Sequence, residues 1–189
     1  PYPFEKLAAL KAGVTPAAQP PIALSIGEPK HPAAALVKQV LIEQLAHLST
    51  YPSTKGLPEL RHAIAHWADR RFDLDGALDP EQHVLPVKGT REALFPFAQA
   101  IVDRAQPQPL VLCPNPFYQI YEGAAYLAGA EPHFLNCVAA SGFQPDFDAV
   151  PAAVWQRCQL LYLCSPGNPT GAVIDAATLQ KLIALADQK

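Results

Sequence analysis

Three short segments of the sequence combine residue types that suit the binding of a small ligand. The first, Lys88-Gly89-Thr90-Arg91, lies between an apolar run and a helical pattern. Glycine lets the backbone turn tightly, and the N–H groups at a helix start attract phosphate with the help of the helix dipole. Thr90 and Arg91 would add a hydroxyl group and a positive charge. By itself the segment also fits an ordinary helix start, and it matches neither GxxxxGK[ST] nor GxGxxG.

The second segment, Pro114-Asn115-Pro116-Phe117-Tyr118-Gln119-Ile120-Tyr121, follows the apolar run LVLC. Tyr118 and Tyr121 are three residues apart and would share one face of a helix. An aromatic ring at the exit of a strand can stack on a flat ligand. The alternative is an aromatic pair that packs in the core.

The third segment, Ser165-Pro166-Gly167-Asn168-Pro169-Thr170-Gly171, follows the apolar run LLYLC. Its prolines and glycines surround one asparagine, which predicts a rigid polar turn. Such a turn would hold the amide of Asn168 at a fixed angle. That arrangement suits a hydrogen bond to a ligand oxygen.

Short apolar runs alternate with helical patterns over most of the chain, which predicts an α/β fold with a mostly parallel sheet and helices on both faces. The expected strands are residues 83–87, 110–113, 132–138 and 159–164. The expected helices are residues 32–48, a helix that Pro58 opens, and residues 90–105, 117–130, 145–154 and 175–187, the last capped by Asp175. Residues 1–30 are expected to be irregular, with a short extended segment at 22–26. In parallel sheets ligands bind beyond the carboxyl ends of the strands, where all three segments fall.

The composition excludes several classes of protein. Half of the 189 residues are hydrophobic, 16% are charged and the net charge is −3, without the basic stripe of a nucleic-acid-binding protein. No apolar run reaches the roughly 18 residues of a membrane helix. The four cysteines show no CxxC spacing. A disulfide framework is not expected in a chain this long and this apolar, which favours a reducing cytoplasm. His62 and His66 lack a third ligand, so no metal site is predicted, and Asp146 and Asp148 are interpreted as caps.

The order of the motifs resembles the class I/II aminotransferases, which depend on pyridoxal 5'-phosphate. SIGEP, YPSTKGLPELRHAIAHW, GTREAL, PNPFYQIY and SPGNPTG follow one another over the whole chain. Within the family, PYPFEKL, SIGEPKHP and CPNPFYQIYEGA are most similar to the bacterial N-succinyldiaminopimelate group. The resemblance implies the aspartate-aminotransferase-like fold. Residues 51–189 would form an incomplete large cofactor-binding domain, after an N-terminal segment and first helix at 1–50.

The same resemblance implies which residues hold the cofactor. Gly89, Thr90 and Arg91 would bind its phosphate group. Tyr118 would stack on the pyridine ring, and Asn168 would form a hydrogen bond with the phenolic oxygen.

Other implied roles concern the substrate and a second subunit. Tyr51 would reach the phosphate of the partner's cofactor, so a homodimer is expected. Gly27 would lie near the substrate carboxylate, and Asn168 would also take part in binding the substrate. Lys30, in a proline-flanked turn, would favour a long succinylated diacid; the alternative is an exposed loop lysine.

We expect the chain to be the N-terminal part of a longer protein, because the family's Schiff-base lysine and its later aspartate, tyrosine and arginine have no match here. Lys88 adjoins the phosphate segment, at the opposite end of the cofactor from the aldehyde, so no catalytic residue is assigned and the chain alone should be inactive. The complete enzyme would move an amino group between glutamate and N-succinyl-2-amino-6-oxopimelate. The alternatives are an alanine, aspartate or aromatic aminotransferase, or a non-catalytic regulator that senses the cofactor.

Overall fold

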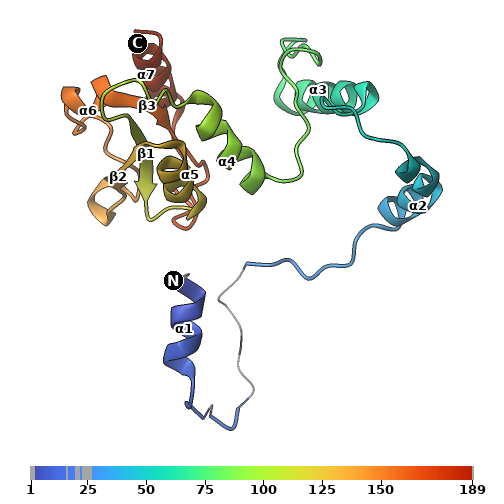
Figure 1. Ribbon diagram of the computed structural model, residues 1–189, viewed down its shortest axis with the longest axis horizontal. Helices are drawn as coiled ribbons and strands as arrows, with labels where there is room; N and C mark the ends of the chain where they lie inside the picture. The colour runs from blue at the N-terminus through green and yellow to red at the C-terminus, as the bar shows by residue number, and fades with distance from the viewer. Residues whose placement is uncertain (1–2, 16, 20–21, 23–26, 189) are drawn as a thin grey trace. The chain divides into compact units, whose positions relative to one another are not determined.

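The computed structural model describes residues 3–15, 17–19, 22 and 27–188. Contacts divide the chain into two compact units, Pro1–Pro52 and Ser53–Lys189. The helices of the first unit are α1 (Pro3–Lys11), α2 (Ala35–Glu43) and a short 3-10 helix (Leu45–Ser49) (Figure 1).

Two predictions for the first unit need correction. The helix expected at residues 32–48 is split, because α2 ends at Glu43 and a separate 3-10 helix follows. The α1 helix lies where irregular structure was expected, and its sequence PFEKLAALK is rich in strong helix formers. The extended segment expected at 22–26 lies outside the described residues apart from Ile22.

The second unit opens with α3 (Pro58–Phe72), in agreement with the sequence prediction. Pro58 occupies the first turn, where a helix does not use the missing N–H. The helix ends at Phe72, and its C-cap Asp73 has a left-handed backbone (φ 53°). This turn lets the N–H group of Leu74 also donate to the carbonyl of Asp69, over 3.3 Å.

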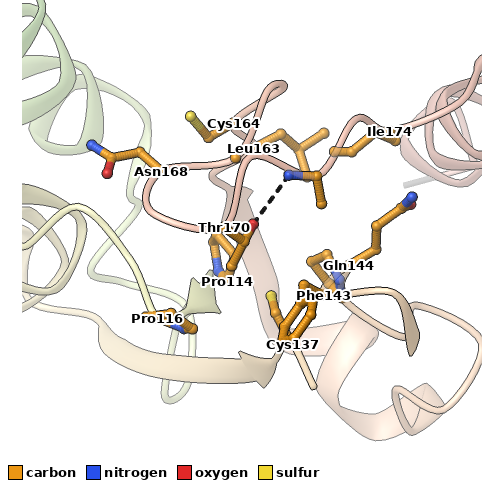
Figure 2. A pocket seen from close by; sticks show the side chains of 13 residues that line it. Pro114, Pro116, Cys137, Phe143, Gln144, Leu163, Cys164, Asn168, Thr170 and Ile174 are labelled. Atoms are coloured by element: carbon orange, nitrogen blue, oxygen red, sulfur yellow. Dashed lines mark hydrogen bonds between the residues drawn. The ribbon is translucent and has the colours of Figure 1, made fainter. Parts of the chain in front are cut away.

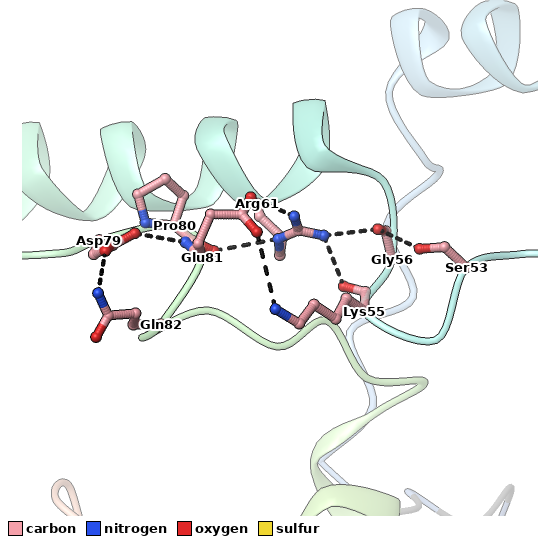
Figure 3. A network of polar contacts seen from close by, with 8 residues as sticks. All are labelled: Ser53, Lys55, Gly56, Arg61, Asp79, Pro80, Glu81 and Gln82. Atoms are coloured by element: carbon pink, nitrogen blue, oxygen red, sulfur yellow. Dashed lines mark hydrogen bonds and ion pairs between the residues drawn. The ribbon is translucent and has the colours of Figure 1, made fainter.

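Arg61 of α3 is 4% exposed. Its guanidinium group forms hydrogen bonds with the chain segments before and after the helix. It donates to the carbonyl oxygens of Lys55 (3.3 Å), Gly56 (2.8 Å) and Pro80 (3.2 Å). It also forms an ion pair with Glu81 (Figure 3). One buried cation therefore holds the segment before α3 and the turn after it to the same helix.

The remaining residues of this unit build a parallel sheet with the strand order β2-β1-β3. The strands are β1 (Leu110–Asn115), β2 (Glu131–Asn136) and β3 (Cys158–Leu161). The central strand β1 begins with four buried residues. A central parallel strand is covered on both faces, which is why it appears in the sequence as the unbroken apolar run LVLC.

Alternate side chains of β1 contribute to two separate apolar cores. The helices around them are α4 (Thr90–Ile101), α5 (Ile120–Ala128), α6 (Ala152–Arg157) and α7 (Ala176–Ala186). Val111 and Cys113 pack with residues of α4 and α5. Leu110 and Leu112 pack with Leu135 of β2 and with residues of α6. The predicted α/β class, with helices on both faces of a parallel sheet, is confirmed.

Residues 83–87 were predicted to be a strand, and this prediction is wrong. The segment has no regular structure, and no described residue pairs with it. Pro86 has no N–H group to donate to a neighbouring strand. Its ring instead lies against Gly56, where an added Cβ atom would be 3.0 Å from Pro86 Cγ.

Two helices begin later than the sequence predicted. The α5 helix starts at Ile120, so Tyr118 precedes it and does not share a helical face with Tyr121. The α6 helix starts after Pro151. A residue before proline disfavours helical backbone, so Val150 cannot continue a helix into Pro151.

The last helix, α7, has the predicted N-cap. Oδ1 of Asp175 accepts a hydrogen bond of 2.7 Å from the N–H group of Thr178. Among the described residues, no helix has the length and apolar character needed to cross a membrane.

Candidate functional site

The start of α4 has the backbone of an anion-binding turn. Gly89 is its N-cap, with φ 142° and ψ 157°. Residues that have a side chain rarely adopt this φ angle. A Cβ atom at Gly89 would also lie 2.9 Å from Oε2 of Glu92. The first N–H groups of a helix have no acceptor within the helix. Together with the helix dipole, they make this end suitable for a phosphate.

Arg91 links the start of α4 to the segment that follows β1. Its Nε atom donates a hydrogen bond of 2.8 Å to the hydroxyl oxygen of Tyr118. The guanidinium carbon also lies 5.8 Å from the centre of the Tyr118 ring, within the range of a cation–π contact. The phenol that accepts this bond still has its own hydrogen to donate. Two of the three segments singled out in the sequence therefore come together.

Tyr121 joins this pair to the core. Its ring meets Tyr118 edge to face at 6.1 Å and stacks on Tyr162 at 4.4 Å. The Tyr162 hydroxyl donates to the Leu94 carbonyl of α4 over 2.7 Å. Burial raises the pKa of both buried tyrosines to about 12, so their hydroxyl groups stay protonated at neutral pH.

The turn at 165–171 is closed by its own hydrogen bonds. The N–H group of Gly167 donates to the carbonyl of Ala172 over 2.8 Å, and that of Gly171 donates to the carbonyl of Gly167 over 2.7 Å. A Cβ atom at Gly167 would lie 2.6 Å from Oγ1 of Thr170, so a larger residue would displace the Thr170 side chain. Asn168 is exposed at its tip, and Figure 2 shows its amide pointing away from the other labelled side chains.

A pocket of about 20 Å³ lies under this turn, lined by residues such as Cys137, Gln144 and Thr170. This volume is close to that of a single water molecule. A ligand of the size that the three segments suggest does not fit inside it. The candidate ligand-binding groups are instead those at the start of α4, on Tyr118 and on Asn168.

The family model for aminotransferase class I and II matches residues 19–189. The chain belongs to the class I and II aminotransferases. These enzymes depend on pyridoxal 5'-phosphate. The family predicted from the order of the motifs is confirmed.

Several aminotransferases are similar to the chain. The LL-diaminopimelate aminotransferase of Syntrophobacter fumaroxidans is 35% identical over 190 residues, which cover 98% of this chain and 47% of the relative. An aminotransferase of Neisseria meningitidis superposes with a TM-score of 0.89 at 44% identity, covering 100% of this chain and 48% of that one. A mutant aspartate aminotransferase of Thermus thermophilus superposes with a TM-score of 0.79 at 31% identity, covering 98% and 46%. The chain spans about half the length of the curated relatives it matches.

The residues present fit the cofactor of these aminotransferases. Gly89 adds no side chain at the start of α4, where the first N–H groups of the helix lie. Arg91 brings a cation to the same end of the helix, and it orients the aromatic ring of Tyr118. The exposed amide of Asn168 offers an N–H donor to an oxygen. An anion, a flat ring and an oxygen acceptor are the features that pyridoxal phosphate would present to these groups.

The other residues that the resemblance assigned belong to the first unit. Gly27, Lys30 and Tyr51 are all exposed, and the side chain of Tyr51 is 99% exposed. Their roles stay predictions.

The pairs that could mimic other sites have ordinary surroundings. His62 and His66 are exposed on α3, and the described residues include no group of three or more side chains arranged to hold a metal. Asp146 accepts a hydrogen bond from the N–H group of Ala149, and Asp148 forms an ion pair with Lys181 at 3.6 Å. Asp146 closes a turn, and α6 begins only after it, so neither aspartate caps that helix.

Tyr162 and Leu94 also belong to the candidate site, although no sequence motif predicted them. Tyr162 is 4% exposed, and its hydroxyl reaches α4 across 68 residues of sequence. One local signal exists, because Tyr162 is the only residue of the apolar run LLYLC with a hydroxyl group, and a buried hydroxyl needs a partner. No local pattern identifies a backbone carbonyl of another element as that partner.

Proposed function

We propose that the full-length protein is a pyridoxal-phosphate-dependent transaminase and that the described unit supplies one side of its cofactor site. The observation that carries this proposal is the hydrogen bond from Arg91 to Tyr118. It holds an anion-binding helix start next to an aromatic ring at the exit of the central strand, as a phosphorylated aromatic cofactor requires.

The residues of this chain have separate tasks in the proposal. The N–H groups at the start of α4, with Thr90 and Arg91, bind the phosphate and set the position of the cofactor. The ring of Tyr118 lies against its pyridine ring, and Asn168 donates an amide hydrogen to its phenolic oxygen. When bound, the cofactor supplies a conjugated ring that accepts the electron pair left at the amino acid's α-carbon. The lysine that moves the proton would belong to the part of the protein that extends beyond this chain.

The proposed substrate is a long diacid of the diaminopimelate type, with glutamate as the amino donor. The similarity to LL-diaminopimelate aminotransferases supports this skeleton. The sequence resemblance favours the N-succinylated form, whereas the names of the curated relatives favour the free diamino acid. Both forms have a carboxylate far from the reacting carbon, which a cation such as Lys30 would recognise.

Kinetics on the full-length protein would separate these candidates. Purified enzyme would be assayed with N-succinyl-LL-diaminopimelate, with LL-diaminopimelate and with aspartate, each with 2-oxoglutarate as the acceptor. We expect the highest kcat/KM for one of the two long diacids. If aspartate were the best substrate, the proposed specificity would be wrong. If no substrate were used, the proposed transaminase activity would be wrong as well.

The proposed assembly is a cytoplasmic homodimer in which Tyr51 of one subunit contacts the cofactor phosphate bound by the other. The dimer is supported only by the family resemblance. Sedimentation equilibrium of the full-length protein measures its mass directly, and a monomer would contradict the shared site.

A further inference from the structure

Tyr121 packs between two other tyrosines at the candidate site. Its ring edge meets Tyr118 with an angle of 87° between the ring planes. Its ring face stacks on Tyr162, with the planes 12° apart.

Together with two hydrogen bonds, these ring contacts form a closed series of interactions that begins and ends on α4. We call this series the circuit, and its members are Arg91, Tyr118, Tyr121, Tyr162 and Leu94. Arg91 holds the hydroxyl of Tyr118 at 2.8 Å. Tyr118 meets Tyr121, which stacks on Tyr162. The hydroxyl of Tyr162 returns to α4 at the Leu94 carbonyl, 2.7 Å away. Leu94 lies three residues after Arg91, which is about one turn of the same helix.

Close packing in the core holds two tyrosines of the circuit in place. Tyr121 and Tyr162 are 5% and 4% exposed, and they pack with buried residues of α4, α5 and β1 in one core. Side chains in such a core occupy single rotamers at close packing, so a shift of one ring displaces its neighbours. Tyr118, by contrast, is only half-buried. Its orientation depends on Arg91 on one side and Tyr121 on the other.

We propose that Tyr121 and Tyr162 are positioning residues, which together fix the ring of Tyr118 relative to the anion-binding start of α4. This inference rests on the proposed cofactor site and adds to it the two residues that set the position of its aromatic ring. In this proposal neither residue touches the cofactor. The stacked rings transmit the position of α4 to Tyr118.

The test uses the full-length protein with changes that keep the fold. Tyr162→Phe removes only the hydroxyl that reaches Leu94, and Tyr121→Phe keeps the stacked ring and removes only its hydroxyl. Tyr121→Leu removes the ring itself. Tyr126→Phe on the same helix is the matched control, because Tyr126 is 60% exposed and lies outside the circuit. Tyr118→Leu reports separately on the proposed cofactor site.

Three quantities would be measured for each variant: the dissociation constant of pyridoxal phosphate, the visible circular dichroism of the bound cofactor, and the thermal midpoint without cofactor. A net hydrogen bond corresponds to about a three- to tenfold change in affinity. We therefore expect Tyr162→Phe to weaken cofactor binding by about that factor and to reduce the dichroism. Tyr121→Leu should lose more of both, and Tyr121→Phe should restore most of the loss. Tyr126→Phe should match the wild type.

The outcomes separate the two proposals. If the Tyr121 and Tyr162 variants had a lower thermal midpoint but wild-type affinity and dichroism while Tyr118→Leu weakened binding, both residues would be ordinary core residues and the inference would be wrong. If Tyr118→Leu also left the affinity unchanged, the cofactor site itself would be misplaced, and the inference would fail with it.

Discussion

Nε of Arg91 and the hydroxyl oxygen of Tyr118 are 2.8 Å apart, although 27 residues separate them in the chain. The bond connects a cation at the start of α4 with a half-buried ring at the exit of β1. In the proposed site the same arginine would face the cofactor phosphate while it orients the ring. Its two tasks depend on a planar guanidinium group with several N–H donors.

Arg91→Lys should therefore weaken pyridoxal phosphate binding even though the charge is kept. Lysine is a point charge without a donor at the Nε position, so the bond to Tyr118 is lost. A hydrogen bond to a charged group corresponds to about a tenfold or larger change in affinity. Fluorescence titration of the full-length protein measures it, with Arg70→Lys on α3 as the control. Equal affinities of Arg91→Lys and the wild type would show that the bond has no part in cofactor binding.

Asn168→Ala should raise the apparent pKa of the bound cofactor's chromophore. An amide donor stabilises the ionised phenolic oxygen and so lowers that pKa, and alanine removes the donor. The measurement is a spectral titration of the full-length enzyme between pH 5 and pH 10, a range of about five units around neutrality. Gln180→Ala on the exposed side of α7 is the control. An unshifted titration curve for Asn168→Ala would remove Asn168 from the site.

Mixing two inactive variants should restore activity if Tyr51 serves the partner subunit. In a mixed dimer of Tyr51→Phe and Thr90→Glu subunits, one site would have its own Thr90 and a Tyr51 from the partner. That site would be intact, whereas the second site would have both defects. Activity should therefore rise toward about half of the wild-type value per mixed dimer, since each active site works independently. No recovery after unfolding and refolding the two variants together would place Tyr51 in its own subunit's site or outside both.

Arg61→Gln should lower the stability of the second unit by about 2–4 kcal/mol. The change removes a buried cation and leaves the carbonyl groups of Lys55, Gly56 and Pro80 without their donor. Urea unfolding of the full-length protein gives the free energy of unfolding, with Arg70→Gln as a surface control. A loss no larger than that of the control would show that water replaces the arginine without penalty.

The partner of Arg61 makes part of this stability depend on pH. The pKa of the Glu81 carboxyl is lowered from its ordinary value of 4.5, chiefly by the hydrogen bond from Arg61. The contribution of Glu81 is therefore complete above pH 4.5 and is lost as the pH falls through the lower pKa of the folded state. In Glu81→Gln, the free energy of unfolding should therefore fall less steeply at acidic pH than in the wild type. Its dependence on pH near neutrality should be unchanged.

Lys30→Ala should reduce activity selectively on long diacids. The distal carboxylate of a diaminopimelate-type substrate would lose a charge-assisted hydrogen bond, which lowers kcat/KM about tenfold or more. A short amino acid has no such carboxylate and should react at the wild-type rate. Steady-state kinetics with both substrates decides this, with Lys38→Ala on α2 as the control. Equal losses on both substrates, or no loss, would leave Lys30 an exposed loop residue.

The sequence by itself determined the features that depend on neighbouring residues. The run LVLC was predicted to be a strand, and a continuous apolar run is typical of a parallel strand that is covered on both faces. Asp175 could be recognised as an N-cap, since the cap bonds a backbone N–H group only three residues away. The glycines of the segments at 88–91 and 165–171 also marked turns, and Gly89 and Gly171 have the positive φ angles that favour glycine. These constraints are local, so they are visible in the order of the residues.

The tertiary structure decided whatever depends on a distant partner. Residues 83–87 have strand-like composition, but a strand exists only where another strand pairs with it, and Pro86 packs against Gly56 instead. Arg61 looked like one of several helix arginines until three distant carbonyl groups and Glu81 surrounded it. Tyr118 and Tyr121 could have been a simple aromatic pair in the core. Their connection to Arg91, Tyr162 and α4 follows from how the parallel strands bring separate loops to one edge of the sheet, which no local pattern encodes.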